Sequence, residues 1–162
     1  MAKQDDAAKK NARAKTGSAR RRARELALQG LYQWRVGQSD AAAIEAHIAD
    51  LDEFKRADQV LLMELLRGIL SLHTQLEEQL QAHLDRKFSE LSPIEASILL
   101  ISAFELTQHL HTPYRVIINE GIELAKSFGG TDGHKYVNGV LDKLAANVRS
   151  AEIAAMASGK AR

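Results

Sequence analysis

The sequence predicts an all-α protein with about seven helices. Three observations lead to this class. Proline occurs only twice in 162 residues, and the strong helix formers Ala, Leu, Glu and Gln are abundant. Apolar residues recur at spacings of three and four along most of the chain, which is the period of an amphipathic helix. Short stretches rich in Ser, Thr, Asp or Gly separate these periodic segments, as helix caps and turns do.

The first helix is expected to begin at Ser18, as its N-cap, and to stop at Gly37. Its later turns carry one apolar stripe that can root it in a core: Ala23, Leu26, Ala27, Gly30, Leu31 and Trp34. Its first turn carries four arginines instead: Arg20, Arg21, Arg22 and Arg24. Cations at this end oppose the helix macrodipole, so local stability does not explain them. Because guanidinium groups match phosphate oxygens, the cluster indicates a polyanionic partner.

Three more helices are expected between the first one and residue 85. A short one starts at Ser39 or Asp40 and carries Ile44 and Ile48. The next begins at about residue 55 and has a broad apolar face rich in leucine. The spacing of Thr74 and Glu77 is that of a capping box, which predicts a break near residue 73 and a separate helix over residues 74–84.

The last three helices have clear boundaries. Ser92, Pro93 and Glu95 form an N-terminal box before a segment that is apolar nearly all round, as in a central buried helix. Another helix opens at Pro113 and ends at two glycines, residues 129–130. The final helix is capped near residue 131 or 132 and runs to about residue 148.

Charge and composition suggest three parts. Residues 1–24 hold nine Lys or Arg and two Asp, a net charge of +7, whereas the other 138 residues sum to −6. We expect residues 1–17 to be a disordered basic extension, residues 18–149 a helical RNA-binding domain and residues 150–162 a flexible tail. A basic arm on an acidic body is typical of nucleic-acid binding, although a solvated tail explains residues 1–17 about as well.

Catalytic motifs are missing from the sequence. It has no cysteine, no P-loop and no dinucleotide-binding glycine pattern. The pair His109 and His111 lacks a nearby third ligand, so an ordinary surface pair is favoured over a metal site. No segment reads as a membrane span or a secretory signal. We therefore expect a cytoplasmic protein that is not an enzyme, with no cofactor, no metal and no membrane contact.

A second stretch interleaves cations with aromatic rings: Lys126, Phe128, Asp132, His134, Lys135 and Tyr136. Such interleaving suits single-stranded RNA, whose bases stack on rings while its phosphates meet Lys or Arg. On composition alone, a core Phe128 between solvated lysines is slightly favoured. Tyr32 lies off the main apolar stripe of the first helix, where its ring could be half exposed beside the arginines.

Three long segments resemble the NusB family of bacterial transcription antitermination factors. They are ARRRARELALQGLYQW, ELSPIEASILLISAFEL and PYRVIINEGIELAKSFGGTDGHKYVNGVLDKLA, in the family's order and separations, and the resemblance runs from about Ala19 to Val148. It implies two small packed helical bundles, binding of the boxA element of nascent RNA together with the ribosomal protein NusE, and action in an RNA polymerase antitermination complex on ribosomal RNA operons.

The resemblance also assigns roles to residues. RNA-binding residues would be Arg20, Arg21, Arg22, Arg24, Tyr32, Lys126, Phe128, Asp132, Lys135 and Tyr136. Asp132 either contacts RNA or tempers affinity by repelling phosphate. The ribosomal partner would dock at the helix that starts SPIE, with Glu95 as the main contact and Glu105 as a weaker one.

Two other functions stay open at this point. In one, the acidic body is a protein–protein adaptor for the ribosomal protein and RNA contact is secondary. In the other, the chain is a helix-turn-helix DNA regulator, which fits poorly because the basic helix buries itself after its first turn. The sequence leaves a weak homodimer open as well.

Overall fold

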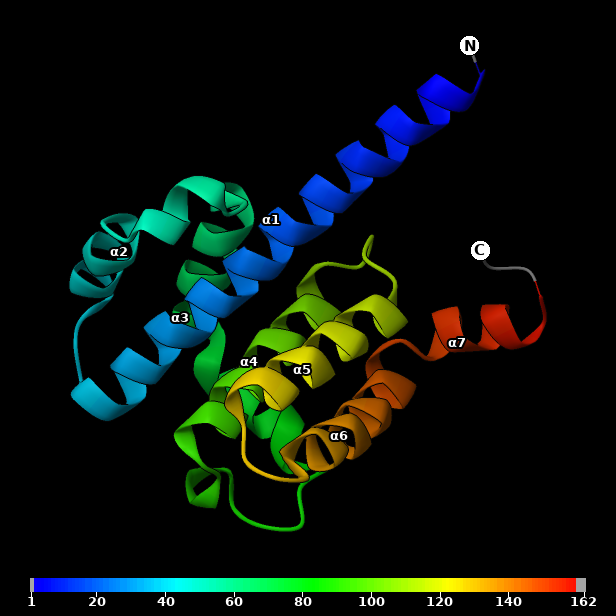
Figure 1. Cartoon of the computed structure of the whole chain (residues 1–162). Helices are drawn as coiled ribbons and strands as arrows, with labels where there is room; N and C mark the ends of the chain where they lie inside the picture. Colours follow the sequence, from blue (N-terminus) through cyan, green and yellow to red (C-terminus); the bar gives the residue numbers. More distant parts are fainter. Residues whose placement is uncertain (1, 160–162) are drawn as a thin grey trace. The chain divides into compact units, whose positions relative to one another are not determined.

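A computed structural model describes residues 2–159 (Figure 1), and this described part is all-α, as predicted. Its α-helices are α1 (Ala2–Gly37), α2 (Ala41–Ala49), α3 (Gln59–Gln81), α4 (Pro93–Gln108), α5 (Tyr114–Phe128), α6 (Gly133–Val148) and α7 (Ser150–Ala157). Two 3-10 helices, η1 (Asp52–Arg56) and η2 (Phe88–Glu90), lie in the connections on either side of α3. None of the described helices is long and apolar enough to cross a bilayer.

The chain divides into two compact units, residues 1–68 and residues 69–162. In the first unit α1 packs against α2 and η1. Gly30 allows this close approach, since a Cβ there would lie 2.8 Å from Leu66 Cδ2 and 3.0 Å from Ile44 Cγ2. Most of the apolar stripe expected on the first helix is indeed buried, including Ala23, Leu26, Ala27 and Leu31.

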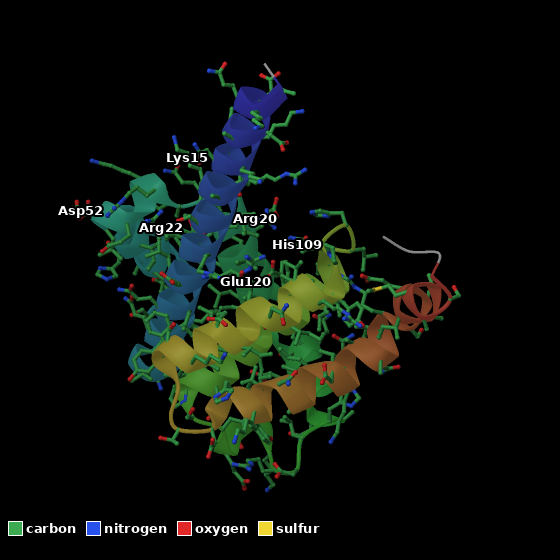
Figure 2. The ribbon with its side chains drawn as sticks, turned by 45° about the vertical axis from the view of Figure 1, so that its right-hand side comes forward. Lys15, Arg20, Arg22, Asp52, His109 and Glu120 are labelled. Carbon is green, nitrogen blue, oxygen red and sulfur yellow. The ribbon has the colours of Figure 1, made fainter. Side chains whose placement is uncertain are left out.

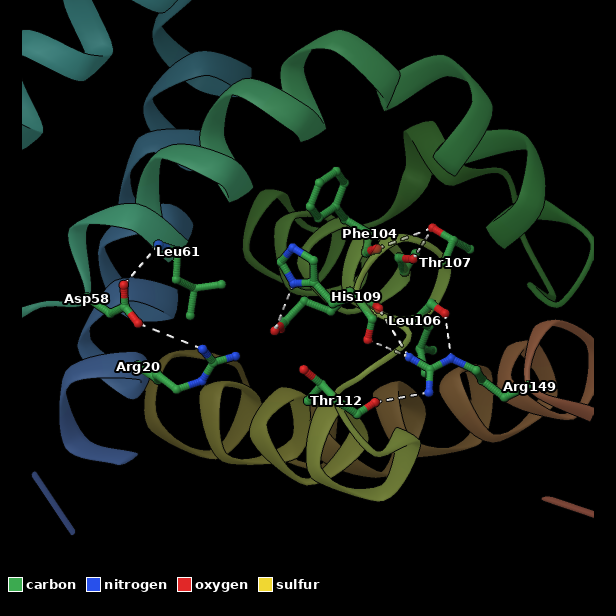
Figure 3. Close-up of polar contacts among 11 residues, drawn as sticks. Arg20, Asp58, Leu61, Phe104, Leu106, Thr107, His109, Thr112 and Arg149 are labelled. Carbon is green, nitrogen blue, oxygen red and sulfur yellow. Dashed lines mark hydrogen bonds and ion pairs between the residues drawn. The ribbon is translucent and has the colours of Figure 1, made fainter. Parts of the chain in front are cut away.

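Asp58 connects the start of α3 to α1. Its side chain accepts a hydrogen bond from the Leu61 amide at 3.0 Å, which caps the first turn of α3. Its own amide donates to the Ala19 carbonyl at 2.9 Å. Its second carboxylate oxygen lies 3.7 Å from Arg20 Nη1 (Figure 3). One carboxylate thereby fixes the α3 terminus beside the arginine-rich turn of α1.

The ends of the chain differ from the sequence-based prediction. Residues 2–17 form the first turns of α1 instead of a disordered extension, and Ser18 lies inside the helix instead of capping it. Ala and Lys are frequent there and favour helix, and extending a helix that is already packed avoids the cost of nucleation. Residues 150–157 likewise form α7 instead of a flexible tail. Residue 1 and residues 160–162, which also belong to the two predicted tails, lie outside the described residues.

The predicted break near residue 73 is also wrong, because α3 continues to Gln81. Its apolar positions keep the helical period through this region, with Ile69, Leu76 and Leu80 all buried. Burial of that continuous stripe outweighs the local capping preference of Thr74, which is exposed.

The second unit is built around α4. Eleven consecutive residues, from Ala96 to Leu106, are buried, which confirms the prediction of a central helix. The expected N-cap at its start is formed, since Ser92 Oγ accepts a hydrogen bond from the Glu95 amide at 3.2 Å. Helices α5 and α6 pack against α4 and against each other. Gly121 allows this packing, because a Cβ there would meet Ser102 Oγ at 2.7 Å and Leu141 Cδ1 at 3.1 Å.

The buried guanidinium of Arg149 caps the C-terminal end of α4. Its nitrogens donate to four backbone carbonyls, those of Glu105, Leu106, His109 and Thr112, at 2.7 to 3.3 Å (Figure 3). It also pairs with Glu152 on α7, whose other carboxylate oxygen accepts from the Tyr114 amide at 3.1 Å. The last carbonyls of a helix lack intrahelical partners, and Arg149 supplies them here.

Candidate nucleic-acid interface

The arginine-rich turn of α1 lies where the helix leaves its packed section. Arg21 is exposed, whereas Arg20 and Arg22 are half exposed. Arg20 forms the ion pair with Asp58, and Arg22 Nη1 donates to Ser18 Oγ at 3.0 Å, one helical turn earlier. In Figure 2 the side chains of Arg20 and Arg22 lie on different sides of α1. The turn therefore presents guanidinium groups over a broad arc.

The ion pair of Arg20 does not remove this side chain from the candidate interface. The two side chains are 29% and 30% exposed, and their closest N···O distance is 3.7 Å. Exposed pairs of this kind contribute at most about 1 kcal/mol. A phosphate group that accepts two parallel hydrogen bonds from the guanidinium, one at each of two oxygens, can therefore compete with Asp58.

Arg24 differs from the expectation. Its side chain is only 3% exposed, because the helix turns this position toward packed residues. A buried guanidinium cannot reach a phosphate without moving, so Arg24 is withdrawn from the set of RNA contacts. Three arginines, Arg20, Arg21 and Arg22, remain in that set.

Two of the predicted aromatic residues are exposed. Tyr32 is 41% exposed on α1, and Phe128 is 48% exposed at the last position of α5. Tyr32 follows Arg21 by eleven residues, which is about three turns and about 16 Å along the same helix face. Exposed aromatic rings can stack on the bases of single-stranded RNA, so these two are candidates for base stacking.

Three predicted residues lie around the α5–α6 connection: Lys126 in the last turn of α5, Asp132 in the connection and Lys135 in the first turn of α6. Asp132 precedes α6 with a left-handed backbone (φ 63°), which aspartate tolerates better than most residues. Its carboxylate lies 3.2 Å from Lys135 Nζ, and Lys126 Nζ lies 3.7 Å from Glu123. All four side chains are about half exposed or more, so both lysines can turn to an incoming phosphate.

Tyr136 belongs to a cluster that the sequence did not indicate. Its hydroxyl donates to Asp85 Oδ1 at 3.0 Å, and the Arg86 guanidinium lies 4.8 Å from its ring centroid. Arg86 Nε also donates to Asp85 at 2.8 Å. Asp85 and Arg86 are some fifty residues from Tyr136 in the sequence, so only the fold brings them together. The three side chains form one edge of a candidate interface in the second unit.

The electrostatics of this cluster follow from its contacts. The hydrogen bond from Arg86, and after it the one from Tyr136, lowers the pKa of Asp85. Desolvation by burial, and then the bond to Asp85, raises the pKa of Tyr136. The carboxylate is therefore ionised and the phenol neutral at physiological pH, so the hydroxyl stays a donor. A cavity of about 410 Å³ adjoins them, lined also by His83, Lys135 and Lys143.

The two predicted partner-binding residues have different surroundings. Glu95 is partly exposed in the first turn of α4, with Oε1 2.9 Å from the Cβ position of a side chain at Gly133. It is also near enough to raise the pKa of Arg86, after the larger effect of Asp85. Glu105 is only 1% exposed, so it is withdrawn as a docking residue. The fold thus brings Glu95 to the same end of the second unit as Tyr136.

Metal binding has no support in the part of the chain that the structure describes, where no group of three or more His, Cys, Asp or Glu side chains is placed to hold an ion. His109 instead packs edge-on against Phe104, with ring centroids 5.4 Å apart.

Comparison with known proteins gives a consistent result. A model of the NusB family matches residues 21–146. Three relatives are described as transcription antitermination protein NusB. That of Dechloromonas aromatica is 59% identical over 143 residues, covering 88% of each chain. That of Nitrosospira multiformis is 57% identical, covering 82% of this chain and 84% of the relative, and that of Bordetella pertussis is 55% identical, covering 89% and 96%.

Among solved structures, T. maritima NusB superposes with a TM-score of 0.70 at 27% sequence identity, over 78% of this chain and 90% of that one. The shared fold therefore extends over most of both chains.

Proposed function

This chain belongs to the NusB family of transcription antitermination factors, and from that premise we propose that it binds the boxA element of nascent RNA together with the ribosomal protein NusE. The complex would join RNA polymerase in the cytoplasm and support processive transcription of ribosomal RNA operons. Binding alone performs this function, so no catalytic step and no cofactor is required.

The observation that carries the proposal is the solvent-facing turn of Arg20, Arg21 and Arg22 on a helix rooted in the core. A fixed helix holds these guanidinium groups in one place, which lowers the entropy lost on binding. Their contacts with phosphate supply affinity and orientation, whereas base recognition requires stacking and edge contacts. Tyr32 and Phe128 supply exposed rings for that purpose.

The proposal is tested by fluorescence anisotropy with labelled boxA RNA, a scrambled RNA of the same composition, and duplex DNA as competitors. We expect boxA to bind tighter than the scrambled RNA, and NusE to increase that preference. Stronger binding to duplex DNA than to either RNA would favour the DNA-regulator alternative.

An adaptor role for the ribosomal protein is supported by a specific feature, the partly exposed Glu95 on an acidic body. Glu95→Lys reverses the charge at this point, so we expect at least a tenfold loss of affinity for the basic ribosomal partner while the free protein keeps its RNA affinity. Co-purification and an RNA titration of the free protein measure the two effects. If NusE still binds normally, the partner docks elsewhere.

Asp132 provides a prediction of opposite sign. Asp132→Asn removes a negative charge and frees Lys135 from its ion pair, while asparagine tolerates the left-handed backbone. Removing one phosphate-repelling charge at about 4 Å in water is worth about 1 kcal/mol, so RNA binding should tighten up to about fivefold. A titration with boxA RNA measures this change. Unchanged or weaker binding would mean that Asp132 does not temper the affinity.

A further inference from the structure

The first half of α1 lies before the residues that the family model matches, which begin at residue 21. Residues 2–18 are all exposed and helical. This segment carries the basic residues Lys3, Lys9, Lys10, Arg13 and Lys15 and only two acidic residues, Asp5 and Asp6. The helical form of this segment gives its charges a fixed geometry.

Helical spacing sorts these cations onto faces. At about 100° per residue, Lys3, Lys9, Lys10 and Arg13 fall within the same sector of about 120° as Arg20 and Arg21. Lys15 falls on the opposite side with Arg22, and Figure 2 shows these two on one side of α1 and Arg20 on the other. We term the four cations of this sector that precede Ser18 the basic stripe: Lys3, Lys9, Lys10 and Arg13. The stripe leads along the same face to Arg20 and Arg21, and the distance from Lys3 to Arg21 along the helix is about 27 Å.

We propose that the basic stripe binds the RNA that flanks boxA, as a helical continuation of the arginine-rich turn. The inference rests on the proposed function, because one RNA strand must reach both parts. The positive charge of the stripe is complementary to a polyanion. Because the stripe continues into Arg20 and Arg21, we expect it to bind the same RNA strand as those two arginines. Four cations with only Asp6 among them leave a net charge of about +3 on this face.

Residues 16–18 join the stripe to the arginine-rich turn, and substitutions there test whether the stripe acts as a helix. Thr16, Gly17 and Ser18 are weak helix formers in succession, and Thr16 Oγ1 donates to the Ala12 carbonyl at 2.9 Å. A Cβ at Gly17 would meet no atom within 4 Å, so alanine fits without strain. Gly17→Ala should favour the helix about fivefold, whereas Gly17→Pro should break it.

The experiment uses the full chain and three RNAs: boxA alone, boxA with ten unstructured nucleotides on its 5′ side, and boxA with ten on its 3′ side. Titrations between 50 and 200 mM salt give the slope of log affinity against log salt. For the wild type we expect one of the two extended RNAs to give a slope steeper by about 2 than boxA alone, because the stripe neutralises about three further phosphates. The variant with Lys3, Lys9, Lys10 and Arg13 replaced by Ala should lose that increment and bind boxA alone normally.

Matched single variants distinguish the stripe from unspecific charge. Arg13→Ala should lower the slope for the extended RNA by about 0.7, whereas Lys15→Ala, with the same loss of charge on the opposite face, should leave it unchanged. Gly17→Ala should tighten binding of the extended RNA and Gly17→Pro should weaken it. The inference would be overturned if Arg13→Ala and Lys15→Ala changed the slope for the extended RNA equally. It would also be overturned if the two Gly17 variants had equal effects on the affinity for that RNA. Either result would favour a disordered charged tail.

The two proposals fail in different ways. If the wild type binds boxA alone and neither extension adds to the slope, the inference is wrong and the proposed function stands. If boxA alone does not bind, the proposed function is wrong and the inference falls with it.

Discussion

Replacement of Arg20, Arg21 and Arg22 together by alanine is expected to weaken binding of boxA RNA about a hundredfold at physiological salt. Each exposed arginine–phosphate contact contributes about 1 kcal/mol, and the three neutralise separate phosphates. The slope of log affinity against log salt should fall by about 2. Anisotropy titrations at several salt concentrations measure both quantities, and circular dichroism should show unchanged helix content because none of the three side chains is buried.

A matched pair of double variants distinguishes the effect of the arginine-rich turn from the effect of net charge. The double variants Arg21→Ala with Arg22→Ala, and Arg67→Ala with Arg115→Ala, lose the same charge. Arg67 and Arg115 are exposed cations on α3 and α5. Only the first pair should lower affinity strongly, by about tenfold or more. Equal losses in both pairs would show that net charge, and not the arginine-rich turn, determines RNA binding.

Replacement of Arg149 by methionine is expected to lower the free energy of unfolding by about 3 to 5 kcal/mol, the cost of removing one partner from a buried charged network. Four carbonyls would lose their donor, and those of Glu105 and Leu106 belong to the last turn of α4. At this chain length the midpoint of thermal unfolding should fall by about 10 °C or more. Thermal and urea unfolding followed by circular dichroism measure the change.

Two further variants identify its cause. Arg149→Lys keeps the charge but lacks the guanidinium fork, so most of the loss should remain. Glu152→Gln removes the ion pair but keeps an acceptor for the Tyr114 amide, and its side chain is 26% exposed. It should cost only about 1 kcal/mol or less. A loss in Glu152→Gln as large as in Arg149→Met would assign the stability to the ion pair instead of the capped carbonyls.

Local signals in the sequence predict much of this fold. The Ser92–Glu95 box, the proline before α5 and the glycine after it set boundaries that the structure confirms. These signals act within one turn of a helix, so the sequence carries them completely. Thr74 shows their limit, since a capping preference yields to a buried stripe that extends past it.

Contacts between distant residues account for what the sequence could not predict. Arg149 reaches carbonyls about 40 residues away, and Asp85 meets Tyr136 across 51 residues. Arg24 is an arginine in the same cluster as Arg20, Arg21 and Arg22, yet packing buries its side chain. Glu105 likewise occupies a central helix whose every face is covered. The sequence therefore nominates candidate site residues by type and segment, whereas their exposure depends on packing between distant residues.

The central claim is that RNA lies against the arginine-rich turn of α1, and crosslinking tests it most directly. Labelled boxA RNA containing 4-thiouridine is irradiated with the full chain, and the crosslinked peptides are identified by mass spectrometry. We expect crosslinks at residues 20–32 of α1 and at Phe128 or Tyr136, with the α1 crosslinks lost when Arg20, Arg21 and Arg22 are replaced by alanine. Crosslinks confined to other segments, such as α7 or the start of α5, and unaffected by those replacements, would contradict the claim.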